Sequence, residues 1–564
     1  MYNRGLFHKW VPGIVQLLLI ILLTAVILLI KPINAANISM MASSTGVLTE
    51  YYMWGNYAVI IGFSLVLPFI WRIKTRFRSK ELLITSFVVM AVMSIIAAKA
   101  TIGELVVAAC FIFGVANMIA NVEMLLPIIG IISPDKEKKR FYAVFYPICI
   151  SSSQVGGYLA SKMSLNVGWE MLHYYSAATL LATAIVCVIV CHNQRFDRKT
   201  PFYYIDWVGV SMYITALMCM AYIFAFGKQQ DWFNSLDIIR ATILIIASIV
   251  ALIARQLIIK HPFLSFKLYK IRDVRYGLLL LVAQGMFMGV GTIMSIYTTA
   301  ILGYNWITNG ELALMTLPGI VLAGYVAFHW SKNQIPVKMY IFSGFAAYFL
   351  YTVMLYFMMV PELNIAQFYL PQILNGYGMC ALFIGVWIYV FDKVNPELNV
   401  ILPSVAPVMI FRSFIVMAFF VCLFGWLHYL FQLQSVGDLA VYFDTQTIGQ
   451  TPLLIRDVQL NAILAANKRL LGYIIIAGLG VLTFVLIHSF GRQKYWIARY
   501  NASKSKRQVI ENQKEKIIFN HYIIKIKKKM KEQSTKSQKK CLYNRCKRHF
   551  RSVGTKQFSQ SKAG

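Results

Sequence analysis

Charged residues are scarce in this sequence. Asp, Glu, Lys and Arg together make up 13% of its 564 residues, about half the usual share of a soluble domain. Hydrophobic residues make up 59% instead, which is more apolar surface than a water-soluble fold can cover. Acidic residues are the scarcer sign, with 22 Asp and Glu against 54 Lys and Arg. The composition therefore predicts a membrane protein.

Signatures of catalysis and metal binding are missing as well. None of the nine cysteines forms a CxxC pair, so neither a zinc site nor a disulfide framework is indicated. The chain has no P-loop, no zinc-protease motif and no GxSxG nucleophile elbow, which disfavours an ATP-driven pump and the common hydrolases. We therefore expect a protein without enzyme activity, metal or cofactor.

Long apolar stretches are what the sequence has in place of these motifs. A helix needs about 20 apolar residues to cross the hydrocarbon, because each backbone polar group must be paired within the segment. The stretches that qualify are 11-40, 52-71, 81-99, 103-132, 141-163, 169-191, 204-226, 237-258, 276-300, 310-330, 337-360, 366-391, 402-431 and 469-490. They predict an all-α polytopic membrane protein with about 14 transmembrane helices.

Basic residues alternate between the connections that join these stretches. Connections after even-numbered stretches hold 21 Lys and Arg, and those after odd-numbered stretches hold 7. Because Lys and Arg accumulate on the cytoplasmic side, both termini are expected to face the cytoplasm, and we place the protein in a bacterial inner (plasma) membrane. The largest external segment is then 432-467.

The segment 492-564 carries most of the net charge, +19 of a total of +32. We predict a basic cytoplasmic tail here. Its isoleucines among lysines, at 517-526, could lie on anionic lipid headgroups as an amphipathic helix, and a solvated disordered tail is the alternative. Nucleic acid is not an expected partner, because no recognised nucleic-acid-binding module accompanies the charge.

Five stretches carry a family resemblance in their order and spacing. They are PFIWRIKTRFRSK (68-80), SSSQVGGYLASKMSLNVGW (151-169), YIDWVGV (204-210), MTLPGI (315-320) and VNPELNVILPSVAPVMIFRSF (394-414). Together they resemble the fourteen-helix drug:proton antiporter branch of the major facilitator superfamily, the EmrB/QacA type, over nearly all of 11-490. The structural motif residues that this resemblance implies are Gly156, Gly157, Trp169, Asp206 and Pro318.

The resemblance implies two pseudo-symmetric six-helix bundles plus two extra helices. The bundles would be 1-200 and 266-491, with two linking transmembrane helices in 201-265. Departures from the family pattern concern the mechanism: Cys110 stands where the family has a helix 4 arginine, and Ser152 and Ser153 replace a glycine-proline pair. Fold and topology are therefore carried over, and proton coupling by the family's usual residues is not.

Charged residues inside a membrane are costly, so each one is a candidate for function. Glu123 lies within a predicted span that also holds Asn117 and Asn121, and it could line a substrate or ion path or make a local hydrogen bond. Arg412 lies inside a later span and needs an acid or a carbonyl as partner. Arg412 or Lys31 could hold Glu123 ionised, although Lys31 could also reach the interface. Gln154 is a weaker pathway candidate, with core packing as the alternative.

We therefore expect a secondary active transporter that exports a small amphipathic molecule or drug, driven by an ion (proton) gradient. Two alternatives stay open: an uncoupled facilitator or importer, suggested by the missing helix 4 arginine, and a non-transporting membrane receptor or assembly protein. The expected partners are a small-molecule substrate and membrane lipid, and a periplasmic adaptor protein is a candidate partner.

Overall fold

The computed structural model describes residues 6–30, 33–132, 138–193, 205–259, 269, 271–333, 336–391, 405–440, 451–488 and 490. Within these ranges helices are joined by turns and short connections, and the one β feature is an isolated antiparallel bridge between Phe7 and Cys191. Twelve of the helical segments are long and apolar enough to cross a membrane. The expected all-helical, multi-pass membrane fold is thus confirmed.

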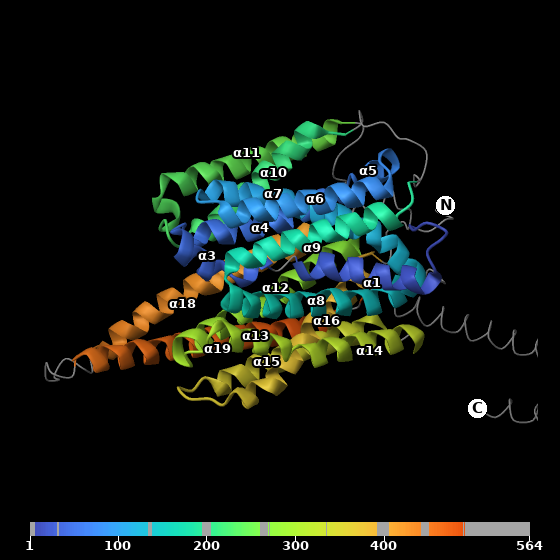
Figure 1. The fold of residues 1–564 in the computed structure, drawn as a ribbon. Helices are drawn as coiled ribbons and strands as arrows, with labels where there is room; N and C mark the ends of the chain where they lie inside the picture. The colour runs from blue at the N-terminus through green and yellow to red at the C-terminus, as the bar shows by residue number, and fades with distance from the viewer. Residues whose placement is uncertain are drawn as a thin grey trace, which may run out of the picture. The chain divides into compact units, whose positions relative to one another are not determined.

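Unit 1 (Met1–His488) is a succession of helices (Figure 1), and the helices of its first part follow one another along the chain. They are α1 (Gly13–Ile30), α2 (Ile33–Ala36), α3 (Ile38–Thr45), α4 (Thr49–Leu65), α5 (Ile70–Arg76), α6 (Ser79–Lys99), α7 (Gly103–Ile132), α8 (Lys138–Val167), α9 (Trp169–Val190), α10 (Trp207–Phe226) and α11 (Leu236–Ile258). The later helices are α12 (Arg272–Ile296), α13 (Trp306–Leu314), α14 (Leu317–Asn333), α15 (Val337–Met358), α16 (Tyr369–Phe391), α18 (Met417–Ala440) and α19 (Thr451–Ile487). Two described segments are π-helical. Tyr297–Ile301 directly follows α12, and Phe411–Val416 directly precedes α18.

Two of the fourteen predicted spans fall on helices that are not among these twelve segments. One is α4, which has 17 residues. The other is α8, where basic residues at the start and the polar run 151–154 interrupt the apolar sequence. Both helices are nonetheless packed among the apolar ones, α4 against α7 and α8 against α14.

The predicted external segment 432-467 is helical at both of its described ends, and its external position stays a prediction. Helix α18 runs to Ala440 and α19 begins at Thr451. No glycine or proline interrupts residues 453–471, and Ala462, Ala466 and Leu470 are buried at helical spacing. The scattered polar residues lower the hydropathy of this stretch without ending the helix.

Glycines bring two pairs of helices into backbone contact with the same geometry. At the α4–α7 crossing, a Cβ on Gly62 would clash with the carbonyl of Phe111, and one on Gly114 would clash with that of Val59. Each glycine thus faces the carbonyl three residues before the partner glycine. Small residues of this kind allow close helix approach inside lipid, where no hydrophobic force drives helices together.

The α14–α16 crossing repeats this arrangement in the later half of the chain. A Cβ on Gly319 would clash with the carbonyl of Ile373, and one on Gly376 would clash with that of Thr316. These carbonyls also lie three residues before the partner glycine. The shared register is the sign of an internal structural repeat.

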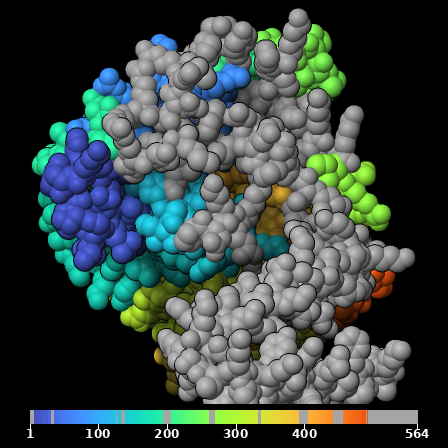
Figure 2. All heavy atoms as spheres, turned by 90° about the vertical axis from the view of Figure 1, so that its right-hand side faces the viewer, coloured from blue at the N-terminus to red at the C-terminus, as the bar shows by residue number. Residues whose placement is uncertain are grey.

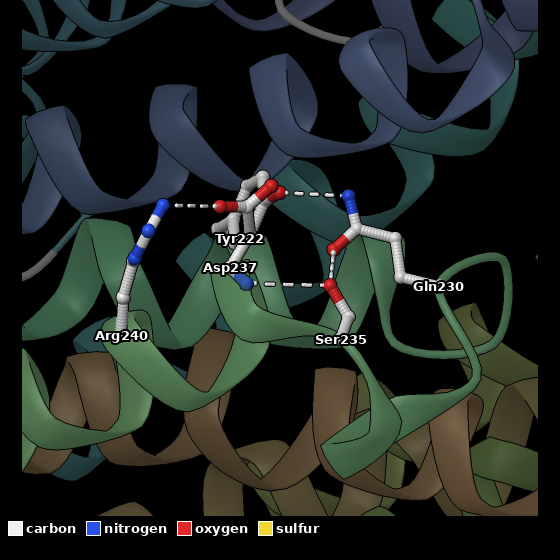
Figure 3. Close-up of polar contacts among 5 residues, drawn as sticks. All are labelled: Tyr222, Gln230, Ser235, Asp237 and Arg240. Carbon is white, nitrogen blue, oxygen red and sulfur yellow. Dashed lines mark hydrogen bonds and ion pairs between the residues drawn. The ribbon is translucent and has the colours of Figure 1, made fainter.

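Helices α10 and α11 form a hairpin whose turn is held by side chains (Figure 3). Gln230 donates to the Tyr222 hydroxyl at 2.9 Å and accepts from Ser235 at 3.2 Å. The Ser235 hydroxyl in turn accepts from the backbone N–H of Asp237, near the start of α11. Arg240 pairs with Asp237 at 3.2 Å on the exposed side of this helix. These contacts hold the turn and so fix the register of α10 against α11.

Candidate functional site

The most deeply buried ion pair among the described residues joins Lys74 and Glu123. Lys74 Nζ lies 3.0 Å from Glu123 Oε2, and the two side chains are 5% and 1% exposed. Removing two charges from water is costly, and a short, well-aligned contact of this kind is what offsets the cost. The second carboxylate oxygen of Glu123 is buried and has no hydrogen-bond partner within the described ranges.

Apolar packing of α5 sets the position of Lys74. Ile70 is buried and Ile73 partly buried in a cluster with Met118 and Val122 of α7, so the same side of α5 turns Lys74 toward α7. Within the stretch 68-80 that carries part of the resemblance, Ile70–Arg76 form the helix α5. The structure pairs Glu123 with Lys74 and not with Arg412, whereas Lys31 lies outside the described residues, so its suggested role beside Glu123 stays a prediction.

Asn117 and Asn121 lie on α7 in the turns before Glu123 and bond to each other. Asn121 Nδ2 donates to both the side-chain and the backbone oxygen of Asn117, each at 3.0 Å. Asn117 Nδ2 donates to the carbonyl of Ile27 on α1 at 3.3 Å. These bonds tie α7 to α1, as expected for amides that fix helix packing inside lipid.

Arg412 lies in the π-helical turn Phe411–Val416 among aromatic rings. Its guanidinium carbon is 3.1 Å from the ring centroid of Phe383 and 4.9 Å from that of Trp387, both on α16. The ring of Tyr146 on α8 lies 5.8 Å away, and Nη1 donates to the carbonyl of Phe383 at 3.3 Å. Arg412 is thus held by cation–π contacts and a carbonyl, and its buried Nε has no partner among the described residues.

Figure 2 shows one face of the molecule, where cyan residues from the first half of the chain lie beside gold residues of the later half. The ring of Tyr146 is 5.4 Å from that of Phe383 and 6.2 Å from that of Trp387. These edge contacts join α8 to α16 across a large separation in sequence. Arg412 therefore sits where the first and second halves of the chain meet.

The remaining predicted residues take less central positions. Gln154 is half-buried on α8, and Gly156 is buried there. A Cβ on Gly157 would meet nothing within 4 Å, so no described helix approaches closely at this glycine. Trp169 is buried as the first residue of α9, and Pro318 lies in the first turn of α14, where its missing N–H costs no hydrogen bond.

Asp206 caps α10 and links it to α11. Its carboxylate accepts from the N–H of Gly209 at 2.9 Å, from Arg255 Nε at 2.7 Å and from Gln256 Nε2 at 2.9 Å. Burial alone would raise the pKa of Asp206, but these hydrogen bonds and the charge of Arg255 outweigh it and lower that pKa. The residue is therefore an ionised structural link between the two hairpin helices.

Sequence reasoning missed Lys74 as a site residue, and the structure draws attention to Gln284 as a further buried polar residue. Lys74 was counted only among the basic residues of a connection, although the apolar residues at 70 and 73 were a signal that this segment has a buried face. Gln284 on α12 is 1% exposed, and neither its amide oxygen nor its nitrogen has a partner in the described part of the chain.

Comparison with known proteins finds bacterial relatives of low sequence identity. Multidrug export protein EmrB of Escherichia coli (strain K12) is 20% identical over 254 residues, which cover 44% of this chain and 48% of EmrB. Fatty acid resistance protein FarB of Neisseria gonorrhoeae is 21% identical over 255 residues, covering 44% of this chain and 49% of FarB. The resemblance to EmrB-type proteins is confirmed. No family model matches the chain.

The chain spans about half the length of the curated relatives it matches. Among solved structures, an auto-inhibited POT family peptide transporter aligns with a TM-score of 0.49 and 12% identity, over 84% of this chain and 97% of that chain.

Proposed function

We propose that this protein is a secondary active transporter that exports a small amphipathic molecule, driven by an ion gradient. The observation that carries the proposal is the buried Lys74–Glu123 pair inside a bundle of apolar helices. Ionisable residues at such depth are expensive and are kept where a charge must be moved or exchanged. Two of the relatives are named for multidrug export and for fatty acid resistance, and these names support export of an amphipathic compound.

In this proposal Glu123 is the coupling residue. Its Oε2 holds the ammonium of Lys74, and its buried Oε1 has no partner in the described ranges and can accept a proton. Protonation neutralises the carboxylate and removes the attraction that holds Lys74 against α7. Because α5 carries Lys74 between α4 and α6, loss of the pair frees this segment to move with its neighbouring helices.

Arg412 is a second residue of the proposed pathway. A guanidinium packed on aromatic rings at the contact between α8 and α16 offers a positive charge in an apolar setting, which suits an amphipathic molecule with an acidic group. Asn117 and Asn121 on α7 and Gln154 on α8 complete the proposed polar path. Lys31 lies outside the described residues, and its place in the path is left open.

Reconstituted vesicles test the proposal directly. The purified chain is placed in proteoliposomes, and uptake of compounds from an amphipathic panel is followed with and without an imposed pH gradient. We expect at least one compound to accumulate only when the gradient is present. Flux that equilibrates the compound regardless of the gradient supports the uncoupled facilitator instead. No flux across the panel favours a receptor or assembly protein.

We propose that both termini face the cytoplasm of a bacterial inner membrane, on the 21-to-7 distribution of basic residues between alternate connections. A periplasmic adaptor protein would then meet the opposite face. Cys541 and Cys546, in the basic tail outside the described residues, should resist a membrane-impermeant thiol reagent in intact cells and react after lysis. Labelling of both cysteines before lysis would reverse the orientation.

A further inference from the structure

An apolar cavity of about 290 Å³ opens between α12, α18 and α19. It is separate from the residues of the proposed transport pathway. Its lining includes Leu279, Met286, Phe420, Val481 and Phe484, and nearly all of its surface is apolar. A concave apolar surface on helices of this kind suits a flexible hydrocarbon chain better than the flat side of a straight helix does.

Cationic and aromatic side chains stand at one end of this cavity. Phe484, in its wall, stacks on His488 with ring centroids 5.3 Å apart, and His488 lies 4.2 Å from the ring of Tyr276. The guanidinium of Arg272 lies 5.2 Å from the centroid of the same tyrosine. Lys338 joins them from α15, where it donates to the carbonyl of Leu486 at 2.6 Å. The side chains at this end thus lead from the apolar wall to the positive charges of Arg272 and Lys338.

His488 lies between the apolar wall and these cations, next to the rings of Phe484 and Tyr276. Burial lowers the pKa of His488 from its ordinary value, and the nearby charges of Arg272 and Lys338 lower it further, against a smaller opposite effect of Asp273. Arg272 is exposed and Arg275 on the next turn is exposed as well. The two arginines can therefore reach a ligand at the surface.

We propose that this cavity and its cationic end form a binding site for one anionic glycerophospholipid. One acyl chain lies against Leu279, Met286 and Phe484, and the phosphate lies by Arg272 and Lys338. Arg272 sits two helical turns before Leu279, roughly 10 Å along the axis of α12, a span that a headgroup and the start of its chain can cover. Aromatic rings at the junction match the boundary between headgroups and hydrocarbon.

The site is tested on the full-length chain, purified in detergent and stripped of lipid. Phosphatidylglycerol or phosphatidylcholine is added back, and bound lipid is counted by native mass spectrometry. We expect the protein to retain one phosphatidylglycerol in preference to phosphatidylcholine. Arg272→Gln should weaken phosphatidylglycerol binding about fivefold and leave phosphatidylcholine unchanged. The matched control is Arg76→Gln, an exposed arginine of α5.

A second variant tests the cavity itself. Gly480 lines the cavity, and a Cβ there would meet nothing within 4 Å, so Gly480→Phe can fill the space without a clash at its backbone. We expect this variant to bind phosphatidylglycerol at least tenfold more weakly. Gly425→Phe on α18 is its control, because a Cβ at Gly425 also meets open space and this glycine does not line the cavity. Equal retention in the two glycine variants, or equal retention of both lipids by the unmodified chain, would overturn the site.

Discussion

Replacing Glu123 by glutamine should lower the free energy of unfolding by about 3–5 kcal/mol. The change removes the carboxylate that lies 3.0 Å from the ammonium of Lys74, and breaking a buried ion pair by removing one partner costs that much. The double variant Lys74→Gln with Glu123→Gln should recover most of the loss, because two neutral amides of similar length can bond to each other. Denaturant-induced unfolding in detergent micelles gives the double-mutant cycle.

The exposed pair of Arg240 and Asp237 is the matched control for this cycle. Its two side chains are 75% and 61% exposed, so the pair Arg240→Gln and Asp237→Asn should change stability by about 0.5 kcal/mol or less. A Glu123→Gln variant as stable as the unmodified chain would show that Lys74 finds another partner and that the buried pair is not a structural requirement.

Alanine at Gly114 or Gly376 should destabilise the fold by about 1–3 kcal/mol. A methyl group at Gly114 strikes the carbonyl of Val59, and one at Gly376 strikes that of Thr316, so each change forces two helix backbones apart. Helix propensity acts the other way, since alanine is favoured over glycine by about 1 kcal/mol in a helix interior. The net loss should appear in both halves of the chain, as a lower midpoint of thermal unfolding.

Gly130→Ala and Gly425→Ala are the controls for the crossings. A Cβ at either glycine meets nothing within 4 Å, so helix propensity alone should act and both variants should be neutral or slightly more stable. If Gly114→Ala and Gly376→Ala also prove neutral, the α4–α7 and α14–α16 crossings are not as close as described, and the repeat loses its support.

Much of the fold follows from hydropathy alone, because a lipid environment leaves few other structures open to long apolar stretches. The predicted stretch 169-191 matches α9, Trp169–Val190, closely. At 432-467 hydropathy did not indicate that α18 and α19 extend into the polar segment, where polar side chains lie on helices that continue past their apolar parts. Hydropathy identifies the apolar part of a helix, and it does not indicate how far the helix extends beyond that part.

The candidate site was only half accessible from the sequence. Glu123 could be singled out because acidic residues inside apolar stretches are rare. Its partner could not, because Lys74 lies in a separate helix whose approach to α7 depends on the packing of Ile70 and Ile73. The same limit applies to Arg412, whose aromatic neighbours come from α8 and α16 and are not close to it in sequence.

Gradient-driven transport by the Lys74→Gln, Glu123→Gln double variant is the most direct test of the central claim, that Glu123 couples flux to an ion gradient. This variant removes the ionisable pair while avoiding the stranded charge of the single change, so a transport defect cannot be attributed to misfolding. In proteoliposomes with an imposed pH gradient, we expect the substrate to equilibrate across the membrane without being accumulated. Uphill accumulation at the level of the unmodified chain would remove Glu123 from the coupling mechanism.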